Sequence, residues 1–308
     1  MAAQDRSVPS VAILSINYNG RPYIQEFLAS LQTVAYANYR LVVVDNASDD
    51  GSPEEIRWLF PQAALMRNGE NLGITGGHNV GIRYCLEQGF DYILFLNNDT
   101  VVNGDFLDRL VESADERTMV APKTYLYGRP GLLDDTVGDF DWWRGVWRGW
   151  LYGKPEPPGL EHPRKINMAS LCCLLVPAAV FRDVGLMDER FFMYYDDFDF
   201  VARARAAGYR LRLNPAAVIH HRKAASSGGV ESPFKVYYAT RNRLYLMRKH
   251  SSRLRFRLFL AYFLATRVGY FVSYLARGQW KQLRAMLMGI ADFFRGRLGR
   301  TYELAHFR

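Results

Sequence analysis

Short apolar runs alternate with polar, helix-like segments along the first hundred residues. There are four such runs: Val11 to Ile16, Leu41 to Val44, Ala63 to Met66 and Tyr92 to Leu96. Short aliphatic runs bounded by polar residues are typical of strands buried on both faces of a sheet. Helices are predicted between them, with Pro22 and Pro53 in first turns and Ser52 as an N-cap. This alternation predicts an α/β fold with βαβ units and a largely parallel sheet.

The second half of the chain has fewer regular patterns. We expect an amphipathic helix over residues 106–116, a strand over 169–176, a helix over 201–207 and a strand ending at Ile219. Residues 129–165 are rich in Gly and Pro, carry four of the six tryptophans and show no clean period. A long irregular stretch inside a domain is often functional. Its tryptophans suit stacking on sugar or lipid, and they equally suit a local subcore.

Polar clusters follow the predicted strands, so they are expected along one edge of the sheet. Asp45 ends the second strand, where its carboxylate can accept hydrogen bonds from a base or a ribose; its neighbours also fit a simple turn. Residues 71–79 place Gly73, Gly76 and Gly77 before a helix. Glycine allows close approach of a ligand, and helix N-termini attract anions. The segment matches neither a P-loop nor the GxGxxG pattern of dinucleotide folds.

The fourth strand ends in Asn97, Asn98 and Asp99. A carboxylate at the carboxyl end of a buried strand lies where open α/β sheets bind ligands, so Asp99 is a candidate ligand for a metal that holds a diphosphate. A local turn is the alternative interpretation. His221, at the end of a later strand, can complete such a metal site with a carboxylate or serve the structure alone.

Asp196, Asp197 and Asp199 form a carboxylate cluster among aromatic residues. Like charges this close raise at least one pKa, and a carboxylate with a raised pKa suits a general base. N-capping of the following helix by Asp196 or Asp197 is the structural alternative.

Charge is divided unevenly along the chain of 308 residues, whose net charge is +8. Residues 241–308 carry 15 Lys and Arg against two acidic residues. This tail suits an anionic partner, and no nucleic-acid-reading module is present, so an anionic membrane surface is favoured. Leu258 to Ala276 is apolar except at Arg267, which favours helices lying on the membrane. A packed helical subdomain or a homo-oligomer interface is the alternative.

Three cysteines are too few for a disulfide framework. The first ten residues also lack an apolar signal segment. We therefore expect a cytoplasmic protein, peripheral at the inner face of the membrane.

Taken together, the motifs resemble those of family 2 glycosyltransferases of GT-A fold, most closely the rhamnosyltransferase-like branch. The similarity runs in order from about Val11 to His250 and rests on Ser15 to Gly20, Val43 to Gly51, Asn71 to Asn79, Leu96 to Thr100, Tyr194 to Asp199 and His221. Two motifs depart from the family pattern. The family's Asp-x-Asp reads Asn97-Asn98-Asp99, and its Glu-Asp pair reads Asp196-Asp197.

The resemblance implies the roles of individual residues. Asp197 is the general base, while Asp99 and His221 hold Mg²⁺ or Mn²⁺. Donor-binding residues are Asn17, Asn19, Asp45, Asn46, Asn71, Gly73, Gly77 and Asn98. Residues that position the acceptor or a phosphate are Asp196, Asp199, Arg241 and Arg243.

The resulting hypothesis is an inverting transferase that moves L-rhamnose from dTDP-rhamnose to a hydroxyl of a lipid-linked or cell-surface glycan. Its catalytic domain covers residues 1–250, with a nucleotide-binding half to about 125, and residues 251–308 form a basic amphipathic helical region. A sugar-phosphate nucleotidyltransferase and a non-catalytic membrane or glycan-binding protein are the alternatives.

Overall fold

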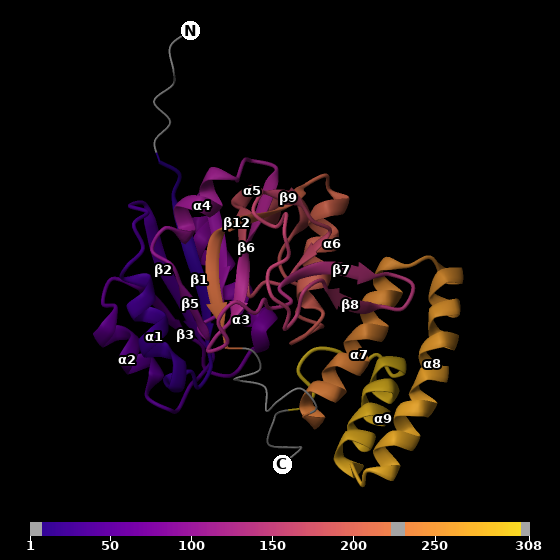
Figure 1. Cartoon of the computed structure of the whole chain (residues 1–308). Coiled ribbons are helices and arrows are strands. Elements are labelled where there is room, and N and C mark those ends of the chain that lie inside the picture. The colour runs from indigo at the N-terminus through magenta and orange to yellow at the C-terminus, as the bar shows by residue number, and fades with distance from the viewer. Residues whose placement is uncertain (1–7, 223–231, 303–308) are drawn as a thin grey trace.

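The computed structural model describes residues 8–222 and 232–302 and contains a central sheet with a helical unit beside it (Figure 1). The predicted strands of the first half are all present. They are β1 (Val11–Asn17), β2 (Tyr39–Asp45), β3 (Ala64–Arg67) and β4 (Tyr92–Leu96). They are parallel in the order β3-β2-β1-β4. Each of the four apolar runs therefore forms a strand, and the four strands lie side by side in the sheet.

The two faces of these strands pack into two separate cores. Val11 and Ile13 point to one core, whereas Ala12 and Leu14 point to the other. Helices α1 (Arg21–Leu31), α2 (Ser52–Leu59) and α4 (Phe106–Glu112) supply the first core, and α3 (Gly73–Glu87) supplies the second. Burial on both faces explains why the strands read as continuous apolar runs.

Two details of the helix starts were predicted wrongly. Gly51, not Ser52, is the N-cap of α2, and the Ser52 hydroxyl donates to Asp50. The expected Gly-rich loop is shorter than predicted, because α3 already begins at Gly73.

The sheet becomes mixed beyond β4. Strand β11 (Cys173–Pro177) runs antiparallel to β4 and to β6 (Thr118–Leu126), and β6 pairs in parallel with β12 (Arg210–His221). The edge strand β5 (Thr100–Val102) is antiparallel to β12. Helix α5 (Ala178–Val184) follows β11, and β9 (Arg164–Lys165) also pairs with β12. His221 is thereby brought opposite Thr100, next to Asp99 in the sequence.

Residues 129–165, expected to be irregular, contain a hairpin. Strands β7 (Val137–Asp141) and β8 (Val146–Gly149) pair with each other, and β10 (Met168–Ala169) pairs with β7. Trp142, Trp147 and Trp150 pack against the main core, while Trp143 is exposed. Three of the four tryptophans therefore pack into the protein, in agreement with the interpretation that they form a local subcore.

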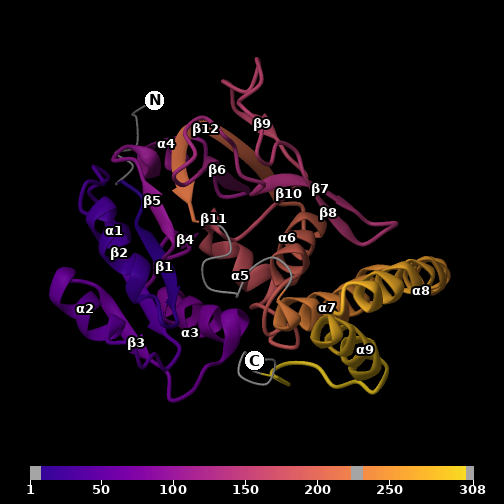
Figure 2. The same cartoon turned by 60° about the horizontal axis from the view of Figure 1, so that its bottom comes forward.

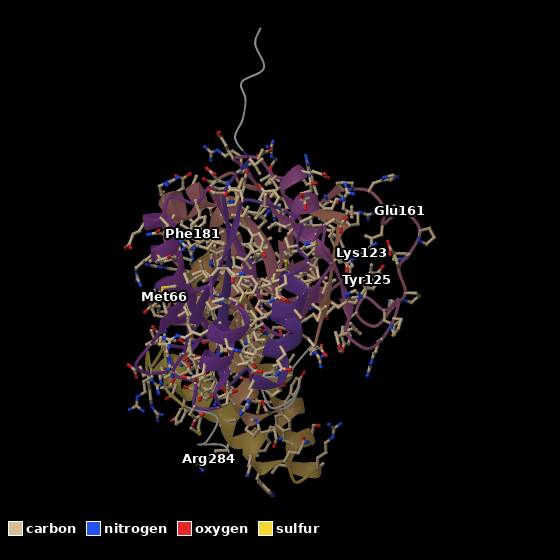
Figure 3. All side chains as sticks on the ribbon, turned by 90° about the vertical axis from the view of Figure 1, so that its left-hand side faces the viewer. Met66, Lys123, Tyr125, Glu161, Phe181 and Arg284 are labelled. Carbon is tan, nitrogen blue, oxygen red and sulfur yellow. The ribbon has the colours of Figure 1, made fainter. Side chains whose placement is uncertain are left out.

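The segment that contains this hairpin is also tied to the main sheet. Lys123 and Tyr125 lie close together on β6 (Figure 3), and both bind the carboxylate of Glu156, at 2.9 and 2.6 Å.

The last part of the described chain is helical. It contains α7 (Pro233–His250), α8 (Arg253–Ala276) and α9 (Trp280–Phe294), whereas α6 (Asp196–Ala206) comes before strand β12. Helix α6 begins earlier than predicted, at Asp196. Helices α7, α8 and α9 lie together on the side of α6, away from α1 and α2 (Figure 2). The domain division near residue 250 stays a prediction, and α7, on its catalytic side, packs Tyr237 and Tyr238 against Ala285 of α9.

Helix α3 lies close to the sheet because of Gly81. A methyl group at this position would stand 2.2 Å from Leu14 Cδ1 and 3.1 Å from Val44 Cγ2, and both of these side chains are fully buried.

We therefore expect Gly81→Ala to destabilise the protein by about 1–3 kcal/mol, as overpacked cores do. In an open helix the same change gains about 1 kcal/mol, so the sign of the effect tests the close packing. Urea unfolding measures it. Gly269→Ala, at an exposed position of helix α8 where the added methyl group meets no atom within 4 Å, is the matched control. A stabilised Gly81→Ala would contradict the packing described.

Candidate functional site

The carboxyl ends of β1, β2 and β4 are joined by a buried polar network centred on Asn17. Asn17 Nδ2 lies 2.7 Å from Asp45 Oδ1 and 2.8 Å from Ser52 Oγ, and Asn17 Oδ1 accepts from Asn98 Nδ2 at 3.0 Å. Asp45 also accepts from the Ser48 hydroxyl at 2.6 Å. Three predicted donor-binding residues thus meet at one edge of the sheet, where they form a wall that is already hydrogen-bonded. Donor contact by these residues stays a prediction.

Asn19 and Asn46 extend this wall in opposite directions. Asn19 is exposed at the rim, where its side-chain oxygen accepts from the Asp49 N–H at 3.0 Å. Asn46 is buried and donates to the Gly73 carbonyl at 2.9 Å. The wall therefore reaches the start of α3.

The start of α3 holds a loop of the protein rather than an open cradle. The Ile74 N–H donates to the Phe192 carbonyl at 2.9 Å, and Asn71 Oδ1 accepts from the Gly73 N–H at 2.8 Å. Gly73 has φ +72°, and a Cβ there would stand 2.4 Å from the Phe192 ring. A Cβ at Gly77 would stand 3.1 Å from Asn46 Nδ2. Of the glycines predicted to receive an anion, Gly73 thus leaves room for Phe192, whose carbonyl occupies an N-terminal amide of the helix.

Asp99 and His221 are brought together, as the sequence predicted, with Asp99 Oδ1 3.4 Å from His221 Nε2. Asp99 is buried, and its Oδ1 makes no hydrogen bond within the described structure. His221 Nδ1 lies 2.6 Å from Asp134 Oδ2, which fixes the ring and turns Nε2 towards Asp99. A carboxylate behind a histidine is the usual support of a metal-bound imidazole.

These two side chains fit a divalent cation. Among residues 8–222 and 232–302, no three His, Cys, Asp or Glu side chains form a preformed metal cluster. Mg²⁺ is commonly held by one or two protein ligands together with phosphate oxygens and water. Asp99 Oδ1, which accepts no hydrogen bond from the described residues, and the oriented His221 nitrogen are therefore candidate protein ligands for a metal that arrives with a diphosphate.

The pKa of His221 reflects several neighbours. Burial lowers this pKa, but the Cys172 thiol, Asp134 and Asp99 together raise it well above its usual value. Neither Asp134 nor Cys172 was assigned a site role from the sequence. Asp134 lies in the stretch read as irregular, and Cys172 in an apolar run, so no local pattern marked either residue.

Asp196 and Asp197 begin α6 directly after a strained turn. Phe192, Tyr194 and Tyr195 all have positive φ, between 63° and 69°. Such conformations cost energy in residues with a side chain and gather at functional sites. Burial raises the pKa of Asp197 to about 6, against the opposing effects of the Phe198 N–H and the Ser170 hydroxyl. Burial and the charge of Asp197 raise the pKa of Asp196 well above its usual range.

Short connections link Asp197 to Asp99 and His221. Ser170, which touches Asp197, accepts from the Cys172 N–H at 3.2 Å, and the Cys172 thiol lies beside His221. In the segment between β6 and β7, Asp134 binds His221, and the charge of its neighbour Asp135 acts on Asp197. A carboxyl group with a raised pKa and the two candidate metal ligands thus share one region of the molecule.

Two predicted positioning residues have structural partners instead. Asp199 is fully buried and binds Arg203, Lys249 and His250 at 2.9, 2.7 and 2.7 Å. Arg241 is also fully buried, and its guanidinium donates to the carbonyls of Arg190, Phe191 and Gly299. Because internal contacts occupy both groups, the structure supports neither of them as an acceptor-binding residue. Arg243 of α7 donates instead to the Arg144 carbonyl.

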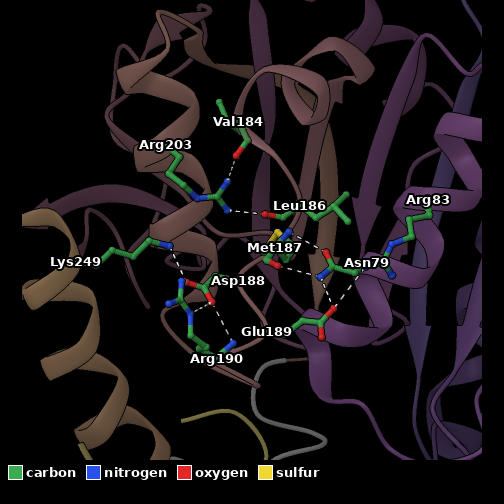
Figure 4. A pocket seen from close by; sticks show the side chains of 10 residues that line it. All are labelled: Asn79, Arg83, Val184, Leu186, Met187, Asp188, Glu189, Arg190, Arg203 and Lys249. Atoms are coloured by element: carbon green, nitrogen blue, oxygen red, sulfur yellow. Dashed lines mark hydrogen bonds and ion pairs between the residues drawn. The ribbon is translucent and has the colours of Figure 1, made fainter. Parts of the chain in front are cut away.

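Two cavities flank this region. One of about 340 Å³ opens beside His221 and is lined by Tyr23, Leu126, Tyr127, Arg129, Tyr152, His221 and Arg222. The other, of about 490 Å³, lies between α3, α6 and α7 (Figure 4) and contains none of the predicted site residues. Its Asp188 already binds Arg190 and Lys249, both at 2.8 Å. We therefore take the cavity beside His221 as part of the functional site.

The sequence profile of glycosyl transferase family 2 matches residues 12–183, more than half of the chain. The chain belongs to glycosyl transferase family 2. It is thus a glycosyltransferase, and its mixed sheet flanked by helices is the GT-A fold of these enzymes.

Relatives of this glycosyltransferase include named sugar transferases. It is 28 % identical over 247 residues to the low-salt glycan biosynthesis hexosyltransferase Agl10 of Haloferax volcanii, covering 78 % of this chain and 76 % of the relative. It is 26 % identical over 263 residues to the N-acetylglucosaminyl-diphospho-decaprenol L-rhamnosyltransferase of Mycobacterium tuberculosis, covering 78 % and 84 %. A dTDP-rhamnosyl transferase, RfbF of Shigella flexneri, is 26 % identical over 243 residues, covering 76 % and 79 %.

Solved structures share the fold at lower identity. A mannosyltransferase of Pyrobaculum calidifontis, in complex with GDP-Man and Mn²⁺, superposes with a TM-score of 0.57 at 15 % identity, covering 95 % of this chain and 89 % of that one. GalNAc-T7 with UDP, GalNAc and Mn²⁺ gives 0.58 at 16 % identity, covering 73 % and 46 %.

The raised pKa of Asp197 makes a prediction about stability. With a folded pKa of about 6 against an ordinary value of 3.8, the folded state binds this proton more tightly than the unfolded state does. The contribution of this group to stability therefore falls as pH rises between about 4 and 6. Asp197→Asn removes this loss, so at pH 7.5 it should be more stable than wild type by up to about 3 kcal/mol.

Urea unfolding at pH 4 and pH 7.5 measures this difference, which should shrink towards zero at the lower pH. Asp49→Asn, at an exposed turn position, serves as the control. If Asp197→Asn unfolds at a lower urea concentration than wild type at pH 7.5, ionisation of Asp197 does not destabilise the folded protein.

Proposed function

We propose that this glycosyltransferase inverts the anomeric carbon as it transfers L-rhamnose from dTDP-rhamnose to a hydroxyl of a lipid-linked or cell-surface glycan. The observation that carries the proposal is the position of Asp197. A carboxyl group with a pKa of about 6 is connected through Ser170 and Cys172 to the Asp99–His221 pair. The choice of sugar and donor is supported by the two rhamnosyltransferases among the relatives.

In this mechanism the acceptor hydroxyl is activated by Asp197. The carboxylate takes the hydroxyl proton while the hydroxyl oxygen forms a bond to the anomeric carbon. The bond between that carbon and the diphosphate oxygen breaks on the opposite face of the sugar. The products are the inverted glycoside, the nucleoside diphosphate and a proton on Asp197.

Asp99 and His221 would hold a divalent metal, which stabilises the charge that develops on the departing diphosphate. Mn²⁺ in the mannosyltransferase and GalNAc-T7 structures supports this assignment. The wall formed by Asn17, Asp45 and Asn98 would orient the nucleoside, with Asn19, Asn46, Asn71, Gly73 and Gly77 around it. Its internal hydrogen bonds would keep this surface rigid before the donor arrives.

We further propose that the enzyme is attached to the inner face of the cell membrane through α8. Within the described ranges, α8 is the helix that is long and apolar enough to cross a membrane. Phe259, Phe263 and Tyr274 are buried against the rest of the protein. Outward-facing apolar residues are exposed by 36 to 64 %: Leu258, Leu264, Val268, Phe271, Val272 and Leu275. A helix packed along one side and apolar along the other suits the membrane interface.

The transfer hypothesis predicts a defined effect of Asp197→Asn. We expect kcat to fall by about 10²–10⁴-fold, the usual contribution of a general base. The affinity for dTDP-rhamnose should stay within about twofold, because donor binding is assigned to the other end of the site. Transfer to a polyprenyl diphosphate-linked sugar, followed by mass spectrometry, measures the first quantity, and thermal shift with the donor measures the second.

Asp196→Asn is the neighbouring control and should lose less activity. Wild-type turnover by Asp197→Asn would assign the base to another residue. Turnover with UDP- or GDP-sugars but not with dTDP-rhamnose would overturn the donor.

The proposed metal site predicts a role for Asp134. Asp134→Asn weakens the support of His221, so we expect Mn²⁺ affinity in the presence of dTDP to fall by about 10–100-fold, as when the carboxylate behind a ligand histidine is lost. Isothermal titration calorimetry measures this without turnover. Asp105→Asn, on the surface at the start of α4, should leave Mn²⁺ affinity unchanged. Equal Mn²⁺ affinity in both variants would show that Asp134 does not support His221 as a metal ligand.

A further inference from the structure

Arg267 stands in the middle of the apolar helix α8 but does not face outward. Its guanidinium lies 4.8 Å from the centre of the Phe263 ring and 4.2 Å from that of Tyr270. Its Nε is buried and makes no hydrogen bond within the described structure, although the side chain as a whole is partly exposed. The charge that interrupts the apolar run is therefore held on the protein side of the helix.

A second arginine, Arg243 of α7, approaches the same aromatic ring. Its guanidinium lies 5.2 Å from the centre of Phe263 and donates to the Arg144 carbonyl. Within the described ranges, no Asp or Glu oxygen lies within 4.0 Å of either guanidinium. Burial, and then the charge of Arg243, lower the pKa of Arg267. Two neighbouring like charges, one buried and one partly buried, are costly without a counterion, so an anion that binds both would relieve the cost.

This pair of arginines lies near Tyr195, two residues before the proposed general base. The Arg144–Gly145 turn that accepts from Arg243 also accepts from the Tyr195 hydroxyl, at 3.5 Å. Tyr195 precedes Asp197 by two residues at the start of α6. The phenol of Tyr195 is within electrostatic reach of Arg243, Arg267 and Asp197. The two cations therefore lie on the α8 side of the base.

We propose that Arg243 and Arg267 bind the phosphate or diphosphate group of a membrane-anchored acceptor. Guanidinium groups suit this ligand because they bind phosphate oxygens through paired N–H donors. The lipid tail would follow the outward apolar face of α8, while the sugar beyond the phosphate would extend towards Asp197. This inference rests on the proposed function, since it assigns the acceptor of that reaction.

Binding of decyl diphosphate to the full chain tests the proposal without turnover, with decyl glucoside as the uncharged probe. We expect wild type to bind decyl diphosphate at least tenfold more tightly than decyl glucoside. Arg267→Gln should lose at least tenfold of the affinity for decyl diphosphate and none for decyl glucoside. Arg267→Lys keeps the charge and should recover part of the loss. Arg257→Gln, which removes an exposed charge from the same helix, should bind both probes like wild type.

Retained decyl diphosphate affinity in Arg267→Gln would overturn the proposal. The proposal would also be overturned if Arg267→Gln, with a normal thermal unfolding transition, lost equal affinity for both probes. The site would then recognise the decyl chain rather than the diphosphate charge.

Vesicle flotation separates an acceptor phosphate from ordinary lipid headgroups. With vesicles containing phosphatidylglycerol, Arg267→Gln should float as well as Arg257→Gln. If Arg267→Gln floats less and these vesicles displace decyl diphosphate from wild type, the pair binds bulk headgroups and the acceptor assignment fails. A transferase that turns over normally yet shows no preference for decyl diphosphate would refute this inference alone. Binding of decyl diphosphate without any sugar transfer would refute the proposed function alone.

Discussion

The carbonyl groups of residues 190–194 are bound from two sides, and the position of the carboxylates at the start of α6 depends on them. From α3, the Ile74 N–H binds the Phe192 carbonyl. From α7, Asn242 Nδ2 lies 2.8, 2.7 and 3.0 Å from the carbonyl oxygens of Phe191, Met193 and Tyr194. These bonds offset the cost of the positive φ angles in this turn. Without them, nothing in the local sequence would hold Asp196 and Asp197 in a partly desolvated position.

The elements that sequence reasoning located are those whose pattern is complete within a few residues. Strands β1, β2 and β4 are buried on both faces and β3 is half-buried at the end of the sheet, and each was visible as an apolar run. By contrast, β5 has only three residues, β7 alternates half-buried and buried positions, and β8 has no fully buried position. Their identity as strands comes from pairing with partners elsewhere in the chain. No single stretch contains that information.

The same distinction applies to the candidate site. The motifs at strand ends meet because parallel strands end at the same edge, which brings Asn17, Asp45 and Asn98 together. The family resemblance assigned site roles to Asp199 and Arg241. Their partners, such as Lys249 and Gly299, are 50 or more residues away and become visible only in the folded chain. Asp134 was missed for the same reason, since its partner His221 is 87 residues distant.

The guanidinium of Arg241 has a consequence for how this enzyme can be handled. It joins the loop before α6 to Gly299 and Thr301, beyond the last helix, and the Tyr238 hydroxyl donates to the Tyr302 carbonyl. Shortening the chain to remove the apolar helices, a common route to a more soluble enzyme, would leave this buried cation without two of its acceptors. The helical unit is therefore part of the fold around the start of α6, and a chain that keeps this unit is needed to keep that region intact.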